Sequence, residues 1–321
     1  MSLLGVDLGA ARTRIYARRR GIVLDEPSAV VRDARTGRIV SYGAETGDDG
    51  HETCRPVSGG LPADDELTRL LVRHFLRRVH RRPFARPRLV MAVPEHATAI
   101  DRAALREVAY EAEARGLLLV PHGLAAALGA GVPVGDGAGW MVIDIGRDAA
   151  RVAVLSHGAV VAAGTVPVGG RALTLAVARL VEREHGLLLD EDEVEAVKRE
   201  HGPPDRQVLV RGRDAETGRE RAASLPVRLV REATRQPVET IAQAAVDTVE
   251  RCPPELVADL GERGAVLVGG GALLRGLDRW LRVALRMPVR RAERPVESVA
   301  LGLGRCVEDQ DLVNRLKAVA P

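Results

Sequence analysis

A segment near the start of this chain is repeated in its middle. The residues LLGVDLGAARTRIYARRRG at 3–21 align with MVIDIGRDAARVAVLSHG at 141–158, at an offset of 137 residues and without a gap. The identical pairs are Asp7 and Asp144, Gly9 and Gly146, Arg14 and Arg151, and Gly21 and Gly158. Each copy predicts an apolar strand, an Asp-x-Gly turn, a second strand, and a glycine turn into a third strand at Ile22–Val31 or Ala159–Val166. Two such units predict two related lobes that face each other.

Helices and strands alternate after each copy. Apolar residues of Glu66–His80 recur with a helical period. The other predicted elements are helices at Ala103–Ala114, Leu124–Ala130, Ala172–Glu184, Glu191–Glu200 and Arg228–Arg251, strands at Arg88–Val93, Leu117–Val120 and Ala265–Val268, and a helix directly after the glycines at 269–271. With 321 residues the chain is long enough for two lobes, so the pattern predicts an α/β fold with a mixed sheet in each lobe. The polar stretch Gly47–Asp64 is expected to be a surface loop.

Three turn regions have the composition of a phosphate cradle. They are Asp7–Thr13, Asp144–Ala150 and Gly269–Leu274, each after an apolar strand. Glycines allow a ligand close to the backbone, and a helix start offers free N–H groups with positive dipole character. Two facing Asp-x-Gly turns would hold a polyphosphate from both sides, with Asp7 and Asp144 binding a magnesium ion through water. For the glycine triplet alone, a purely structural packing role is an equal alternative.

Composition excludes several classes of protein. The net charge is +3 and aromatic residues make up 2% of the chain, which argues against a nucleic-acid-binding protein. No run approaches the ~20 apolar residues of a membrane span, and the start has no signal-peptide pattern. Three widely spaced cysteines predict neither a disulfide framework nor a zinc site. We therefore expect a cytoplasmic protein.

Four stretches resemble the MreB/Mbl family of bacterial actins. They are LLGVDLGAARTRIY, GIVLDEPSAVV, AAALGAGVPV and ERCPPELVADLGERGAVLVGGGALLRGLDRWL, and the resemblance runs nearly end to end. It implies an actin-like, ribonuclease H-like duplicated two-lobe ATPase fold with a central nucleotide cleft. Lobe I would comprise 1–137 and 296–321, with a shortened insertion around 32–64. Lobe II would comprise 138–295, with a small subdomain around 186–228.

The family resemblance also implies a function and a set of site residues. It implies binding of ATP and magnesium, self-association or co-assembly with other MreB-like subunits into filaments, contact with the inner membrane surface, and work with the cell-wall elongation machinery in cell shape. DEVEAVKRE (192–200) is similar to the family's Glu-x-x-Lys helix beside the nucleoside; its alternative is a solvated helix with an i,i+3 charge pair. The implied nucleotide-binding residues are Asp7, Gly9, Ala10, Ala11, Arg12, Asp144, Gly146, Arg147, Asp148, Ala149, Glu195, Ala196, Val197, Lys198, Gly269, Gly270, Gly271, Ala272, Leu273 and Leu274.

The phosphate loops depart from the family pattern. The family's Gly-Thr-Ala-Asn-Thr is Gly-Ala-Ala-Arg-Thr at 9–13, and its Gly-Gly-Thr is Arg-Asp-Ala at 147–149. His122 stands where the family has the glutamate that orients the attacking water. Loss of a positioned base costs about 10²–10⁴ in rate. We therefore expect weak nucleotide binding and a residual ATPase activity at most.

The charged residues of the two loops suggest an internal clamp. An ion pair between Arg12 and Asp148, or between Arg147 and Asp7, would tie the lobes without nucleotide. The alternative is that these side chains turn outward to solvent.

A second predicted site is the segment RRVHRRPFARPR at 77–88. Pro83 and Phe84 resemble the apolar loop with which some family members contact the membrane, and the surrounding arginines suit anionic lipid. Such a contact would place the protein at the inner face of the membrane. The alternative is that the arginines only complement a helix C-terminus.

Two further functions stay open at this stage. A small-molecule kinase of the same superfold is possible because a fold does not fix a function, although only Glu95 and Asp101 offer an acceptor-activating carboxylate. A pseudo-actin scaffold that does not polymerise is a variant of the filament-forming function that the resemblance implies.

Overall fold

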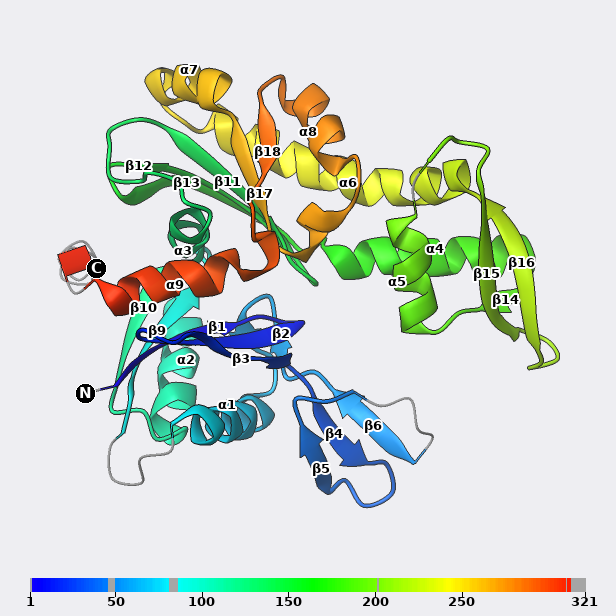
Figure 1. The fold of residues 1–321 in the computed structure, drawn as a ribbon, viewed down its shortest axis with the longest axis horizontal. Helices are drawn as coiled ribbons and strands as arrows, with labels where there is room; N and C mark the ends of the chain where they lie inside the picture. The colour runs from blue at the N-terminus through cyan, green and yellow to red at the C-terminus, as the bar shows by residue number, and fades with distance from the viewer. Residues whose placement is uncertain (1, 46–49, 81–85, 201, 310, 313–321) are drawn as a thin grey trace.

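The computed structural model describes residues 2–45, 50–80, 86–200, 202–309 and 311–312. Its core consists of two five-stranded sheets, one in the lower and one in the upper half of Figure 1, with helices α3 and α9 between them. We call β1 to α3 together with α9 lobe I, and β11 to β18 lobe II. The predicted two-lobed α/β architecture is therefore confirmed.

The sheet of lobe I has the strand order β10-β9-β1-β2-β3. Its strands are β1 (Leu3–Leu8), β2 (Arg12–Ala17), β3 (Gly21–Pro27), β9 (Arg88–Val93) and β10 (Gly116–Pro121). The sheet is mixed, because β1 is antiparallel to β2 and parallel to β9. Helices α1 (Asp65–Val79) and α2 (Ala99–Glu111) pack on one face, and α3 (His122–Gly129) and α9 (Ser298–Glu308) pack on the other.

The sheet of lobe II repeats this plan with the order β13-β12-β11-β17-β18. Its strands are β11 (Trp140–Ile145), β12 (Ala150–Ser156), β13 (Ala159–Val166), β17 (Ala265–Val268) and β18 (Val289–Arg291). Again β11 is antiparallel to β12 and parallel to β17. Helices α6 (Val227–Glu250), α7 (Pro254–Arg263) and α8 (Leu277–Leu285) contribute to the apolar core on the face away from lobe I.

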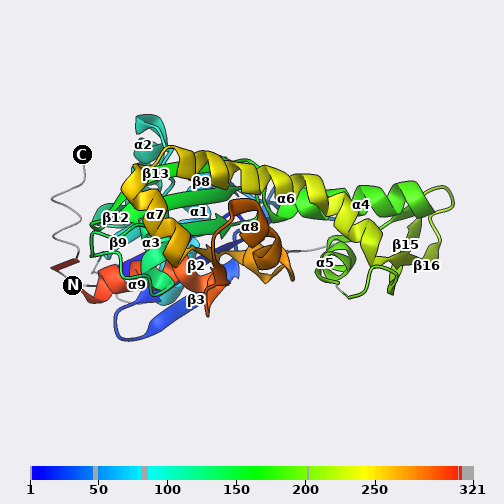
Figure 2. The same cartoon turned by 90° about the horizontal axis from the view of Figure 1, so that it is seen from above.

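Each lobe carries a smaller sheet on the right in Figure 1. In lobe I it has the order β5-β4-β6, made of β4 (Val30–Asp33), β5 (Ile39–Tyr42) and β6 (His51–Cys54), and a short hairpin follows at β7 (Val57–Ser58) and β8 (Leu61–Pro62). In lobe II the strands β14 (Leu187–Leu188), β15 (Gln207–Asp214) and β16 (Glu220–Pro226) pack with α4 (Gly170–His185) and α5 (Glu191–Arg199) around a separate apolar core. Figure 2 shows α4, α5 and this sheet extending beyond the rest of the molecule.

Helices α3 and α9 touch through glycines. A Cβ atom on Gly129 would lie 1.6 Å from the Ser298 carbonyl oxygen, and one on Gly302 would lie 1.8 Å from the Ala125 carbonyl oxygen. The two backbones are therefore in direct contact, which only residues without a side chain allow. Since α9 also packs on β1 and β2, the C-terminal helix completes lobe I next to the junction of the lobes.

Three predicted elements are wrong in detail. The single strand Ile22–Val31 is two strands, β3 and β4, because Ser28 N–H donates to the Ala11 carbonyl and Ser28 Oγ to the Gly9 carbonyl, which turns the chain between them. The expected surface loop Gly47–Asp64 contains β6, β7 and β8 in its described part. The glycine triplet opens only a 3₁₀ turn (Gly270–Leu273), and the helix α8 begins later, at Leu277, after Gly276 at φ +85°.

Candidate functional site

A cavity of about 550 Å³ opens between the lobes, and all three predicted turn regions line it. Eighteen of the predicted residues form part of its wall: Asp7, Gly9, Ala10, Ala11, Arg12, His122, Asp144, Gly146, Arg147, Asp148, Ala149, Glu195, Lys198, Gly269, Gly270, Gly271, Leu273 and Leu274. Ala196, Val197 and Ala272 do not line it. Val197 is buried in the small core of lobe II and Ala272 in its main core, whereas Ala196 is exposed on α5.

The two Asp-x-Gly turns have the same local construction. Asp7 and Asp144 are the next-to-last residues of β1 and β11, and each is buried and paired in the strand register with an arginine, Arg14 or Arg151. A backbone hydrogen bond then closes each turn: Gly9 N–H donates to the Arg12 carbonyl at 3.2 Å, and Gly146 N–H to the Ala149 carbonyl at 2.9 Å. The sequence repeat is therefore a structural repeat down to single hydrogen bonds.

The glycine triplet serves both packing and the cavity. Gly269 has φ +79°, and a Cβ atom there would lie 2.1 Å from Asp144 Oδ1. A Cβ atom on Gly271 would lie 2.2 Å from Ile145 Cγ2, while one on Gly270 would meet nothing within 4 Å. Gly269 and Gly271 therefore let this turn pack on the end of β11, and Gly270 leaves room in the cavity.

Sequence reasoning missed a second glycine pair that supports the lobe II turn. Gly169 and Gly170 stand at the start of α4, and Gly170 N–H donates to the Gly146 carbonyl at 2.8 Å. A Cβ atom on Gly169 would lie 2.6 Å from the same carbonyl oxygen. The stretch VGGRALT could have revealed this pair, because its two glycines precede a helix, as the triplet at 269–271 was expected to do.

His122 crosses the gap between the lobes to contact Asp144. It is the first residue of α3, and its Nε2 lies 2.5 Å from Asp144 Oδ2. Burial by itself raises the pKa of Asp144, but the hydrogen bond from His122, its charge, and the charges of Arg151 and Arg14 outweigh it and hold the pKa below its usual value. Asp144 is therefore a buried carboxylate that already has a partner.

Asp7 has the opposite shift. Burial raises its pKa to about 6, against the opposing charges of Arg14 and His122. The nearby negative charge of Asp144 adds to the rise. The repeat thus contains one aspartate that is easily ionised and one that is not.

Neither of the two predicted clamp pairs occurs in the described part of the chain. Arg12 Nε instead lies 2.6 Å from Asp25 Oδ1 of its own lobe, and Arg147 Nη1 lies 2.7 Å from Glu191 Oε1 of its own lobe. Asp25 lies on β3, the strand next to β2, and Glu191 lies on α5. Each arginine therefore pairs with an acid of its own lobe. The lobes are linked by other groups: His122 with Asp144, Ser58 Oγ with Asp148 Oδ2 at 3.3 Å, and Arg151 Nη2 with the Gly59 carbonyl at 2.6 Å.

On α5, Glu195 and Lys198 form the i,i+3 pair that was the alternative reading of this helix. Lys198 Nζ donates to Glu195 Oε1 and, at 3.0 Å, to Thr174 Oγ1. Burial of Glu195 raises its pKa, but the hydrogen bonds from Lys198 and Thr174 outweigh this and lower it. Because both residues also line the cavity, the pairing is compatible with a contact to ligand.

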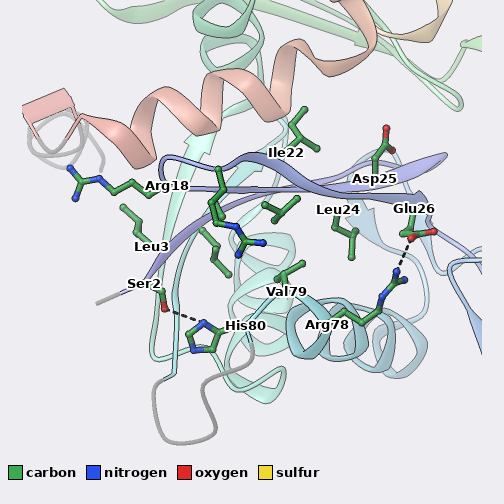
Figure 3. Close-up of a pocket in the computed structure, with 14 residues that line it drawn as sticks. Ser2, Leu3, Arg18, Ile22, Leu24, Asp25, Glu26, Arg78, Val79 and His80 are labelled. Atoms are coloured by element: carbon green, nitrogen blue, oxygen red, sulfur yellow. Dashed lines mark hydrogen bonds and ion pairs between the residues drawn. The ribbon is translucent and has the colours of Figure 1, made fainter.

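A second, larger hollow of about 1020 Å³ lies on the α1 side of the lobe I sheet (Figure 3). Its wall includes Leu3, Leu24 and Val79, and the polar contacts at its rim join Ser2 to His80 and Arg78 to Glu26. None of the predicted nucleotide-binding residues lines it. We take the interlobe cavity as the functional site, because its polar groups converge from both copies of the repeat. Pro83 and Phe84, the predicted membrane contact, lie outside the described residues.

Two general features of the described residues bear on the class of protein. No helix among them combines the length and apolar character required to cross a membrane. Nor do they bring three or more histidine, cysteine or acidic side chains together as a metal-binding group.

Duplicated lobes around a cleft lined by paired Asp-x-Gly turns define the actin-like class of fold. The chain is similar in structure to MreB5 of Spiroplasma citri bound to ADP, with a TM-score of 0.89 at 24% identity over 98% of both chains. It is also similar to a MamK double helical filament, with a TM-score of 0.80 at 21% identity over 96% of this chain and 99% of the other.

The sequence comparisons narrow this class to one family. The family model described as MreB/Mbl protein matches residues 1–315, so the chain belongs to the MreB/Mbl family. It is 40% identical to the cell shape-determining protein MreB of Escherichia coli (strain K12), over 96% of this chain and 94% of that protein. It is 34% identical to the cell shape-determining protein Mbl of Bacillus subtilis (strain 168), over 98% of both.

Proposed function

We propose that this chain is a nucleotide-binding cytoskeletal protein that takes part in cell shape and cell-wall assembly. The observation that carries the proposal is the convergence of three turns from two lobes on one cavity of about 550 Å³, a size that suits a small-molecule ligand. Family membership and the names of the relatives, which are cell shape-determining proteins, support the cellular role. The MreB5 relatives were crystallised with ADP and AMPPNP, so an adenine nucleotide is the natural ligand to test.

We further propose that hydrolysis of the nucleotide is weak or lost. A group that orients an attacking water needs a free acceptor directed at the ligand. His122 is held by Asp144 at 2.5 Å, and the carboxylate of Glu95 accepts a hydrogen bond from the N–H of the next residue, Gly123, at 2.6 Å. Both groups are engaged in structural contacts, so a residual ATPase activity at most is expected.

Magnesium is the cofactor that the family resemblance implies at Asp7 and Asp144. Carboxylate oxygens are suitable donors for this ion, usually through water. However, Asp144 Oδ2 is already held by His122, and the buried guanidinium groups of Arg14 and Arg151 stand beside the two carboxylates. Two buried cations beside the carboxylates repel a divalent ion. These residues do not fit a magnesium ion.

The same proposal includes self-association into filaments and contact with the inner membrane surface through Pro83 and Phe84. It also includes work with the cell-wall elongation machinery in the cytoplasm. Self-association is supported by the likeness to a filament of MamK. The small-molecule kinase is disfavoured, since Glu95 is bonded to Gly123 and Asp101 caps α2. The non-polymerising scaffold remains as the outcome in which nucleotide binds and no filament forms.

The test is a titration with a fluorescent ADP or ATP analogue, with pelleting and phosphate release measured in parallel. Gly270→Val would place a side chain in the open space of the cavity, and we expect at least tenfold weaker binding, about 1.4 kcal/mol. Gly261→Val is the matched control, because Gly261 is also surrounded by open space but lies on α7 outside the cavity wall. Equal binding by the wild type and Gly270→Val, or no binding by either, would contradict the proposal.

A further inference from the structure

Two buried arginines, one from each copy of the repeat, belong to the wall of the interlobe cavity. Arg14 lies on β2 and Arg151 on β12, at positions that the repeat makes equivalent. Each is only 6% exposed, and both line the interlobe cavity. Arginine is almost never buried to this extent unless it is paired, so two symmetric cases in one cavity require an explanation.

Their hydrogen bonds within the protein are incomplete. Arg14 Nη1 is 3.9 Å from Asp7 Oδ2, and its Nε lies 3.2 Å from Asp25 Oδ2 without forming a hydrogen bond. Arg151 donates from Nη2 to the Gly59 carbonyl, but its buried Nε also lacks a hydrogen-bond partner. A buried charged donor without an acceptor is costly, which points to an anionic ligand that completes these contacts.

A third arginine of the cavity has the same property. Arg55 reaches the wall from the segment between β6 and β7, and its Nη2 pairs with Glu45 Oε2 at 2.7 Å. Its Nη1 is buried and has no hydrogen-bond partner. Three of the five side-chain atoms of this kind found among the described residues thus belong to arginines of one cavity, with donors from both lobes.

The phosphate loops themselves have lost hydroxyl donors and carry charged side chains of both signs. Asp148 places a carboxylate in the second loop, and the hydroxyl of the family's threonine is absent at Ala149 and at Ala10. Guanidinium groups bind phosphate in a two-point geometry and need no metal ion between the partners. The two loop arginines, Arg12 and Arg147, are paired with Asp25 and Glu191 of their own lobes, so the arginines on the strands behind the loops are the further cations of this cavity.

We propose that Arg14 and Arg151 bind the phosphate chain directly, one from each lobe, and that this cleft takes a nucleoside diphosphate or triphosphate without a divalent metal ion. The inference rests on the proposed function, because it assumes that a nucleotide enters the cavity. It adds the recognition chemistry: two guanidinium groups in the electrostatic role that a magnesium ion would otherwise have.

The experiment is a titration of the full chain with fluorescent ADP, once in excess EDTA and once in excess magnesium. We expect the wild-type Kd to differ by less than about threefold between the two buffers. Arg14→Leu and Arg151→Gln should each weaken binding in EDTA at least tenfold. Arg32→Leu is the matched control, because Arg32 also has a buried Nε without a partner but lies on β4 outside the cavity wall.

Binding of adenosine distinguishes a variant that has lost only the phosphate contact from one that has lost its fold. It lacks phosphate, so its affinity should be the same for the wild type and for Arg14→Leu, as measured by competition with the fluorescent ligand. Wild-type binding that disappears in EDTA and returns with magnesium would overturn the inference while leaving the proposed function intact. Absence of binding in both buffers would instead contradict the proposed function, and the inference with it.

Discussion

The turn after Asp7 and the turn after Asp144 have the same backbone construction but different surroundings. In lobe I the strand parallel to the central one, β9, is followed by Pro94, and a Cβ atom on the neighbouring Gly60 would meet nothing closer than 3.6 Å. In lobe II the corresponding strand, β17, is followed by Gly269, which is in close contact with Asp144. The second turn also rests on the start of α4 through Gly170.

The electrostatic difference follows from one side chain outside the repeat. His122 hydrogen bonds to Asp144, whereas no hydrogen bond to Asp7 is found among the described side chains. The pKa is consequently lowered for Asp144 and raised to about 6 for Asp7. The duplication therefore determines the backbone of the two turns, and the segments that were not duplicated determine the packing and the pKa of each aspartate.

The largest effect is expected from Gly269→Ala, which breaks the tight packing that only lobe II has. An added Cβ at φ +79° and 2.1 Å from Asp144 Oδ1 combines backbone strain with overpacking, so we expect the free energy of unfolding to fall by about 4 kcal/mol. Chemical denaturation measures it. Gly270→Ala is the control, since that position is open, and an equal loss for both variants would show that the contact with Asp144 is unimportant.

His122→Leu should remove the hydrogen bond that distinguishes Asp144 from Asp7. Removal of one partner of a buried charged pair leaves the other uncompensated, so we expect a loss of about 3 kcal/mol in the free energy of unfolding at neutral pH. The exposed His96 provides the control His96→Leu, for which little change is expected. If the thermal and chemical stability of His122→Leu match those of the control, the link between the lobes does not depend on this hydrogen bond.

Acidification should reveal the raised pKa of Asp7. Its folded-state pKa of about 6 exceeds the ordinary 3.8, so the folded state binds the proton first, and the cost of burying the charge is present above pH 6 and relieved as the pH falls toward 4. The stability of the wild type relative to Asp7→Asn should therefore rise by about 2 kcal/mol from pH 7 to pH 4.5.

Asp144→Asn gives the opposite case. Because the folded-state pKa of Asp144 is lowered, its stabilising contribution is present above about 3.8 and is lost only as the pH falls through the lower folded value. Between pH 7 and pH 4.5 the difference from the wild type should stay nearly constant. Parallel pH profiles for the two variants would contradict the asymmetry between the aspartates.

The smallest effect is expected at the loop arginines. Arg12 and Arg147 pair with Asp25 and Glu191 in contacts that are partly exposed to solvent, so Arg12→Ala and Arg147→Ala should each cost less than about 1 kcal/mol. The measurement is thermal unfolding at low and high salt. A loss above about 2 kcal/mol for either variant would restore the idea that these residues tie the lobes.

The sequence was sufficient for the fold and for half of the residues of the cavity wall. The repeat predicted that Asp7 and Asp144 occupy equivalent turns, and in the structure each of them also has an arginine of the next strand as its register partner. It could not reveal which partner each charged side chain selects, since Asp25 and Glu191 become neighbours of the loops only through the sheet and through α5. The burial of Arg14 and Arg151 could not be predicted for the same reason, because it depends on how the chain encloses the cavity between the lobes.

The position of α9 has a consequence for the order of folding during synthesis. The helix that closes the first lobe is encoded after the whole of the second, and it fills the space between α3 and β1 through glycine contacts that admit no substitute. On the ribosome, lobe II is therefore complete while lobe I still exposes an apolar surface. The half of the protein that is made first is finished last, and a chain truncated before residue 298 would display that surface to chaperones and proteases.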